Sequence, residues 1–363
     1  MKKVLAILLA LVLVLAFSVP VMASVTEVEM IGSDENAYVP IVKAKWETSD
    51  SWCSSDDDTT KSGTQVLPIV PQGEKTVYFW AVVTDRPLLD IKHVWAEIYH
   101  PDETLKVQIE LEQIYCTPWG EDNWLAAADC LEYADLAGLV KYGLTNLDGD
   151  DIDFGDVYTE LFKGEAKMYK GSLTFVHGQP GGFYSVEVYA QDQDSTSVRL
   201  VNCFEYVRTV CIEQDFTTVD FGKLKIDEVQ KVSGDEDMTT DNKPTLKNGG
   251  NIDTTVSVHF SEMYYVDTAG VVTDVELEVV EFDARLGELT TVDPILPCDI
   301  TPIGDIPICN TWELDLSIHP IKLAQDEAGV NLVGIYRGTI TITGEDNGSP
   351  TPGTPCPPLP MMP

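Results

Sequence analysis

Period-two alternation is the feature that most restricts the fold of this chain. Residues 312–318 are apolar at every second position, and so are residues 184–190. Such alternation places one face of a β-strand on a core and the other toward solvent. Residues 76–84 are instead apolar almost throughout, as expected of a strand buried on both faces. The chain is therefore predicted to be mainly β.

Further strands and turn signals divide this β pattern into two domains. Residues 94–100 and 105–112 flank a turn and predict a hairpin with one solvated face. A second series of strands is predicted at 223–229, 254–260, 271–282, 312–318 and 336–343. The pattern of strands in the sequence changes near residues 215–223, so we expect β-sandwich domains at 24–215 and 216–345.

Two segments of the first domain have helical rather than strand spacing. Residues 124–144 are rich in Ala and Leu, and residues 156–169 follow a capping aspartate at Asp156. We expect a helical hairpin inserted into the first sandwich near residues 121–170.

The loop between these helices is dense in carboxylates, which suggests a cation site. Calcium takes six to eight oxygen ligands, and the candidate ligands are Asp148, Asp150, Asp151, Asp153 and Asp156. The second half of the loop resembles a dockerin loop. The first half departs from it, with Asp150 at the expected glycine and Gly149 at an expected carboxylate. A solvated acidic turn that caps the second helix is the alternative.

The N-terminus predicts export. Lys2 and Lys3 precede an apolar run at 4–17 and a small-residue site at 21–23, the arrangement of a secretory signal peptide cleaved after Ala23. No later segment is apolar enough to span a membrane. A mature protein that begins at Ser24 and resides outside the cell is expected. The alternative is an uncleaved N-terminal anchor, for which the apolar run is short of the roughly 20 residues that span a bilayer.

The charge of the chain limits its partners. There are 60 acidic against 23 basic residues, a formal net charge of -37. This charge opposes binding to nucleic acid or anionic lipid and attracts cations. Solubility or adaptation to salt explains the same composition equally well.

Eight cysteines agree with an oxidising compartment. None forms a C-x-x-C motif, and three local couples are disulfide candidates: Cys116 with Cys130, Cys203 with Cys211, and Cys298 with Cys309. Cys53 and Cys356 lack a near neighbour and could bridge each other or another molecule. At least three disulfides are expected.

Motifs for catalysis are missing from the sequence. It has no G-x-S-x-G, Walker or G-x-G-x-x-G motif, and its five histidines are scattered. A glycosidase pair of carboxylates cannot be tested by sequence in so acidic a chain. We expect no enzymatic activity and no organic cofactor.

Short motifs of the second domain resemble a known class of module. Residues 244–251 (PTLKNGGN), Trp312-x-Leu-x-Leu and Gly334-x-Tyr-x-Gly-Thr-Ile-Thr-Ile resemble the immunoglobulin-like modules of archaeal and bacterial cell-surface and S-layer proteins, over residues 219–344. In the first domain, Gly182-x-Tyr184 resembles the strand of such domains in which the Tyr marks a corner. The resemblance implies fold and location rather than chemistry.

Three functions remain open at this point. The first is a structural surface protein, such as an S-layer, sheath or filament subunit or a ligament, which self-assembles or binds other surface proteins. It would use the Pro-rich tail, residues 346–363, as a spacer. The second is a module that binds cations, polysaccharide or protein through the aromatics Trp46, Trp52, Trp119 and Trp124. The third is an extracellular hydrolase.

Overall fold

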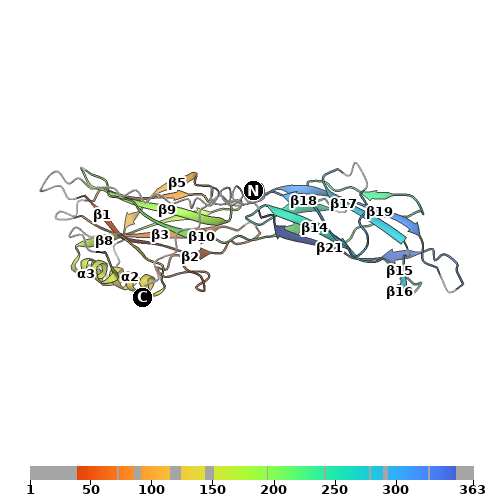
Figure 1. Ribbon diagram of the computed structural model, residues 1–363, viewed down its shortest axis with the longest axis horizontal. Coiled ribbons are helices and arrows are strands. Elements are labelled where there is room, and N and C mark those ends of the chain that lie inside the picture. The colour runs from red at the N-terminus through yellow and green to blue at the C-terminus, as the bar shows by residue number, and fades with distance from the viewer. Residues whose placement is uncertain are drawn as a thin grey trace, which may run out of the picture. The chain divides into compact units, whose positions relative to one another are not determined.

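The computed structural model describes residues 39–71, 73–85, 91–114, 124–143, 151–193, 195–240, 243–277, 279–288, 293–325 and 328–348 (Figure 1). They belong to the second of the two compact units of the chain, which begins at Tyr38. The predicted signal peptide, residues 1–23, and the tail beyond residue 348 lie outside the described residues. Strands dominate and are interrupted by two short helices, which confirms the mainly β prediction.

The first sandwich consists of two five-stranded sheets. One has the order β6-β8-β3-β1-β7, with bounds β1 Ile41–Thr48, β3 Lys75–Thr84, β6 Glu112–Gln113, β7 Lys141–Tyr142 and β8 Ala166–Phe175. The other has the order β2-β10-β9-β4-β5, with bounds β2 Thr64–Val66, β4 His93–Tyr99, β5 Leu105–Glu110, β9 Gly182–Gln191 and β10 Leu200–Tyr206. Neighbouring strands are antiparallel except β2 and β10, which are parallel.

The apolar core of this sandwich lies between its two sheets. The predicted alternation in β9 is confirmed by four fully buried side chains: Tyr184, Val186, Val188 and Ala190. β3 is buried on both faces as predicted, since Phe79 contributes to this core while Trp80 and Val82 pack on the opposite side of the sheet. The predicted hairpin is present as β4 and β5.

A helical insertion packs against the outer face of the β1 and β3 sheet (Figure 1). Its helices are α2, Trp124–Leu136, and α3, Phe154–Lys163. Leu131 of α2 and Leu161 of α3 share an apolar cluster with Trp46 of β1 and Met168 of β8. β1 is therefore covered on both faces, by the sandwich core and by the helices.

Both helices are shorter than their sequence patterns predict. α2 ends at Leu136, Gly138 has a φ of +70°, and residues 141–142 form β7 beside β1 instead of continuing the helix. α3 begins at Phe154 and ends at Lys163, where Gly164 adopts a left-handed C-cap. Residues 166–169, predicted helical, belong to β8, because its ten residues pair with β3 along their full length.

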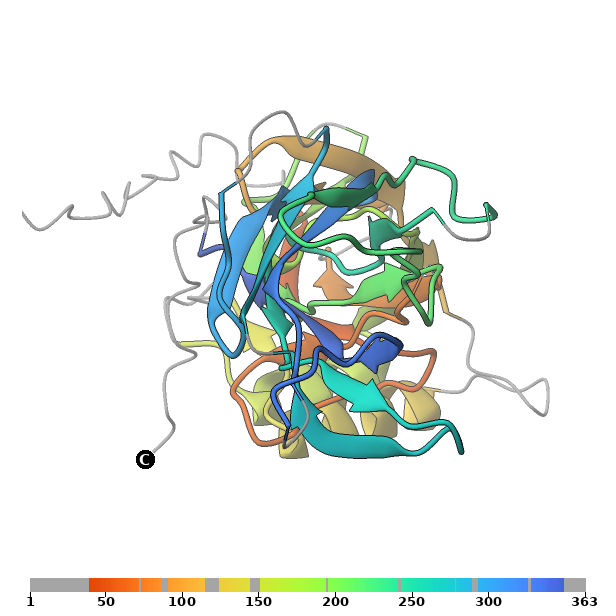
Figure 2. The same cartoon turned by 90° about the vertical axis from the view of Figure 1, so that its right-hand side faces the viewer.

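The second sandwich combines one five-stranded sheet with two three-stranded sheets, whose strands are coloured green to blue in Figure 2. β19, Thr311–Lys322, pairs with β12, Gln230–Val232, with β13, Thr245–Asn248, and with β17, Val279–Leu286. β11, Ile212–Gln214, extends this sheet beyond β13. Two three-stranded sheets have the orders β18-β14-β21 and β16-β15-β20, with bounds β14 Thr254–Phe260, β15 Tyr264–Val266, β16 Val272–Glu276, β18 Ile300–Ile306, β20 Ile335–Arg337 and β21 Ile340–Asp346.

The core of the second sandwich follows the predicted alternation of β19. Leu314, Leu316 and Ile318 are fully buried. Residues 223–229 are predicted as a strand but form none, since Asp227 has a φ of 60° and donates its backbone N–H to Pro320 O. β11 lies in the segment assigned to the first domain yet pairs with β13 of the second. The domain limits themselves stay a prediction.

Each sandwich has a tyrosine that closes a corner. Tyr184 donates its hydroxyl to Pro180 O at 2.8 Å, and Tyr336 donates to Leu332 O at 2.7 Å. Both bonds reach back four residues, which is the geometry of the tyrosine corner in immunoglobulin-like domains. The Gly-x-Tyr motifs thus have the same local role in both sandwiches.

Candidate functional site

The acidic loop before α3 is described only from Asp151 onward. Asp148 and Asp150 lie outside the described residues. Asp153 is the N-cap of α3, and its Oδ1 accepts the backbone N–H of Asp156 at 2.9 Å. The capping aspartate is thus Asp153 rather than Asp156. No group of three or more metal-ligating side chains occurs among the described residues. Calcium binding by this loop stays a prediction.

Two of the predicted cysteine couples are not bonded. Cys298 and Cys309 are both free thiols, and Cys211 is free while Cys203 is disulfide-bonded. Extended strands explain the separation, because β18 runs between Cys298 and Cys309, and seven strand residues span about 20 Å. Close spacing in sequence is therefore a poor guide to pairing in a β protein. Cys116 and Cys356 lie outside the described residues.

Cys53 and Cys130 come together although 77 positions separate them in the sequence. The side chains of these two buried cysteines are hydrogen-bonded to each other, and that contact lowers the pKa of Cys53 against the opposing effect of burial. Trp46 Nε1 donates to Cys53 O at 2.9 Å and fixes the loop that carries it. Sequence spacing gave no signal for this contact, since the helix position of Cys130 depends on the whole insertion.

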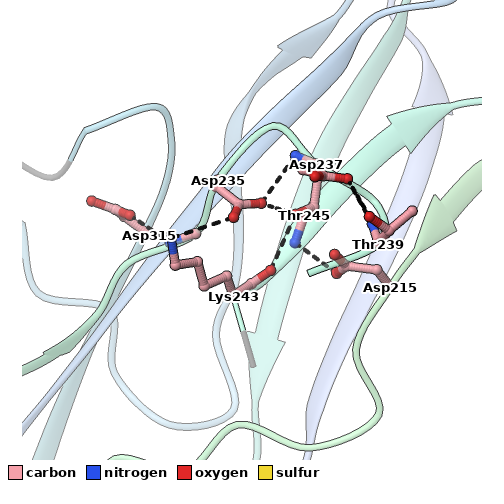
Figure 3. Close-up of polar contacts among 8 residues, drawn as sticks. Asp215, Asp235, Asp237, Thr239, Lys243, Thr245 and Asp315 are labelled. Atoms are coloured by element: carbon pink, nitrogen blue, oxygen red, sulfur yellow. Dashed lines mark hydrogen bonds and ion pairs between the residues drawn. The ribbon is translucent and has the colours of Figure 1, made fainter. Parts of the chain in front are cut away.

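A cluster of aspartates surrounds Thr245 at the start of β13 (Figure 3). Thr245 donates its backbone N–H to Asp215 Oδ1 at 2.9 Å and its hydroxyl to Asp235 Oδ1 at 3.2 Å. Asp315 of β19 accepts the Gly234 N–H at 2.9 Å, and Lys243 Nζ lies 3.4 Å from Asp235. These contacts connect the loop before β13 to both neighbouring strands.

The electrostatics of this cluster are those of a structural network. Hydrogen bonds donated by Thr239 hold the pKa of Asp237 below its usual value, and the backbone N–H of Asp237 does the same for Asp235. Burial raises the pKa of Glu313, and the negative charges of Asp315 and other nearby carboxylates add to that effect. The cluster can attract cations from solution. Each of its four aspartates already accepts a hydrogen bond through Oδ1, whereas Oδ2 of Asp215 is buried without a hydrogen-bond partner.

The aromatic residues predicted as contacts fall into different environments. Trp46 is fully buried and stacks on Trp80 at 5.9 Å, so it belongs to the core. Trp52 is 59% exposed and lies 6.1 Å from Tyr133 of α2, which is 51% exposed. Trp119 and the side chain of Trp124 lie outside the described residues. Of the predicted aromatic contacts whose side chains are described, Trp52 is thus exposed and Trp46 is not.

The described histidines do not converge. His93 lies 3.1 Å from Glu110 and His319 lies 3.1 Å from Glu281, each within its own pair of strands. His100 packs against Tyr184, and burial lowers its pKa. These are isolated contacts of sandwich side chains rather than parts of one centre.

A group of buried charges in the first sandwich has no counterpart among the predicted sites. Lys45 Nζ lies 2.6 Å from Glu47 Oε1, and both side chains are 0% exposed. Asn202 Nδ2 donates to Glu47 Oε2 at 2.9 Å. The only sequence signal is a Lys and a Glu two positions apart within a strand that is otherwise largely apolar.

Comparisons with known proteins point to distant likeness alone. No protein-family model matches the sequence, and no curated protein matches it. Among solved structures, the chain is similar to a protein of the chaperone–tip adhesin complex of CFA/I fimbriae, at 10% identity and a TM-score of 0.27, with 87% of each chain covered. It is also similar to the C-terminal domain of the Streptococcus pyogenes antigen I/II-family protein AspA, at 10% identity and a TM-score of 0.21, covering 86% of this chain and 97% of that one. A third is the C-terminal domain of the Streptococcus agalactiae polypeptide BspA, at 11% identity and a TM-score of 0.18, covering 85% and 96%.

Proposed function

We propose that this protein is an exported, non-enzymatic component of the cell surface that acts by assembling with copies of itself. The observation that carries the proposal is an exposed apolar end of the β16-β15-β20 sheet, where Val272 of β16 and Ile335 of β20 both pair with Val266 of β15. Exposed fractions there are 59% for Val271, 48% for Val272 and 60% for Ile335. Clustered exposed apolar side chains mark interaction surfaces.

The sheet edges favour a second copy as the partner. β16 and β20 are the outer strands of their sheet, and unpaired strand edges are templates for pairing with another chain. Val333, next to β20, is 84% exposed and widens the apolar area. Within the described residues, no helix is long and apolar enough to cross a membrane. Assembly must overcome the repulsion of a strongly acidic chain, so it needs salt or a divalent cation.

The test is to size and image the mature protein at low and high salt, with and without calcium. Ordered assemblies are expected when charge is screened. Ile335→Asp should abolish them, because a new carboxylate at the apolar end of this sheet must be desolvated on contact. Leu136→Asp is the matched control, since Leu136 is 77% exposed on α2, away from this sheet. A wild-type protein that stays monomeric under every condition would remove the proposal.

A binding module is the second candidate function, and the exposed Trp52 and Tyr133 pair favours it. Aromatic rings of this kind stack on sugar rings and supply contact area at low entropic cost. Binding of the mature protein to insoluble polysaccharides should then fall for Trp52→Ala and remain for Phe183→Ala, a 38% exposed aromatic of β9. Equal binding by both variants would exclude this surface.

A further inference from the structure

Two charged side chains of β1 point into the first sandwich because of a bulge. The strand pairs with β3 in regular register except between Val42 and Ala44, where one extra residue is accommodated. After the bulge, Lys45 and Glu47 face the other sheet. Glu47 is paired with Phe79 of β3, whose side chain belongs to the core.

Asn202 of β10 completes the group from the opposite sheet. It shares the inward face of β10 with Phe204, which is 1% exposed. One oxygen of Glu47 accepts from Lys45 Nζ at 2.6 Å and the other accepts from Asn202 Nδ2 at 2.9 Å. An amine and a carboxamide are thus held on the two oxygens of one carboxylate. Lys45 Nζ also donates to Val186 O at 2.9 Å, which limits its orientation.

Stability alone does not account for this arrangement. Removing an ion from water costs several kcal/mol, and apolar residues of similar volume often serve a core equally well. Burial lowers the pKa of Lys45 against the opposing attraction of Glu47, while Glu187 favours the charged amine and Lys141 disfavours it. Desolvation therefore brings the amine closer to its neutral form, which is the nucleophilic one.

We propose that Lys45 and Asn202 become joined by an intramolecular amide bond, with Glu47 transferring the protons. Lys45 gives a proton to the Glu47 carboxylate, and its neutral Nζ attacks Cγ of Asn202. The protonated Glu47 gives that proton to the leaving nitrogen and then takes the second proton lost by the attacking nitrogen. One C–N bond forms and one breaks, and the released ammonia takes this second proton from Glu47 and leaves as ammonium. The reaction needs no oxidant and no cofactor.

The position of the bond gives it a mechanical role. β1 is the first strand of the first sandwich and β10 is its last. A covalent link between them closes nearly the whole sandwich into a loop, which restricts the unfolded chain. Tension applied along the chain would pass through the new bond instead of separating the strands between. The inference stands independently of self-assembly, because the bond would form in a monomer.

Intact mass of the purified mature protein after full reduction tests the proposal directly. The expected mass is lower than that of the signal-cleaved sequence by one ammonia. Peptide mapping should find one branched peptide that contains both Lys45 and Asn202, and trypsin should fail to cleave after Lys45 even in the denatured protein.

Matched variants separate this bond from other losses of ammonia. Asn202→Ala and Lys45→Met should both show the full sequence mass. Asn202→Asp should give the same cross-linked product as wild type, because water leaves instead of ammonia. Glu47→Gln should slow or prevent the reaction. Succinimide formation at Asn248-Gly249 or Asn347-Gly348 would persist in Asn202→Ala and would be cleaved by hydroxylamine.

The wild-type protein decides the outcome even where a variant fails to fold. A reduced wild-type chain at its full sequence mass, with separate tryptic peptides for Lys45 and Asn202, would overturn the proposal. A loss of ammonia that maps to any other pair of residues would overturn it equally.

Discussion

Each of the two sandwiches has its own tyrosine corner, but the two differ in the charged side chains that they bury. Tyr184 and Tyr336 make the same hydrogen bond four residues back, so the local architecture is common to both. The first interior includes Lys45 and Glu47 at 0% exposure, whereas the buried charges described in the second sandwich are the carboxylates Asp283 and Asp315. The same kind of scaffold can therefore bury a pair of opposite charges in one copy and carboxylates alone in the other.

The largest expected effect comes from removing one partner of the buried charge pair. Before the proposed amide bond forms, Lys45→Met leaves Glu47 buried without its counter-ion, which should destabilise the first sandwich by about 3–5 kcal/mol. In the mature protein the loss of the amide bond should add to this cost. Hydrogen exchange read by mass spectrometry should show lost protection in β1, β9 and β10, with the second sandwich unchanged. The control Lys225→Met removes a surface ion pair with Glu228 and should cost less than about 1 kcal/mol. Equal protection in both variants would contradict this account of the pair.

A cavity in the second core should have a slightly smaller effect. Leu316→Ala removes a fully buried side chain of β19 and should cost about 2–5 kcal/mol. The expected loss of protection is confined to residues 212–346. Leu296→Ala, at a 55% exposed position, is the matched control and should change little. Loss of protection in the first sandwich as well would show that the two do not unfold separately.

The corner tyrosines allow a direct comparison between the sandwiches. Tyr184→Phe and Tyr336→Phe each remove one hydrogen bond, at a cost of about 1 kcal/mol. The cost should be greater at Tyr184, which is fully buried, than at the partly exposed Tyr336. Unfolding in guanidinium chloride measures both. A larger decrease in the free energy of unfolding for Tyr336→Phe would mean that burial does not determine how much the tyrosine hydrogen bond stabilises each sandwich.

The smallest effect concerns Glu313 and depends on pH. Its pKa in the folded protein is raised above 4.5, chiefly by burial and then by Asp315 and other carboxylates, so its ionised form is the one that folding disfavours. Stability is thus reduced as pH rises through the folded pKa. Glu313→Gln should raise Tm at neutral pH by the equivalent of less than about 1 kcal/mol. It should leave Tm unchanged below pH 4.5, and a rise that persists there would show a cause other than charge.

Local periodicity predicted the elements whose one face is buried and whose partners lie nearby. β9 and β19 follow their alternation because each strand has a single apolar face against a core. Helix limits were predicted less well, since residues 166–169 carry a helical pattern but gain a full ladder of hydrogen bonds beside β3. Tertiary pairing overrode local preference there.

Side chains that meet across the fold could not be predicted from spacing. Cys53 and Cys130 touch because the helical insertion packs on the loop after β1, and no local motif encodes that contact. Asn202 reaches Glu47 from the opposite sheet for the same kind of reason. The acidic loop, by contrast, was open to local reasoning, and a helix cap was one of its two predicted roles.

The β1 bulge reverses which face of the strand each following side chain occupies. Ile41 packs on the helical side of the sheet and Val42 packs in the sandwich core. Because Lys43 is an extra residue in the strand, the alternation shifts by one position and Trp46 packs against the helices. A single strand then supplies Trp46 to the apolar cluster beneath the helices and the charged side chains of Lys45 and Glu47 to the inside of the sandwich. A search for related chains that assumes strict alternation would therefore assign every residue after Lys43 to the wrong face of β1.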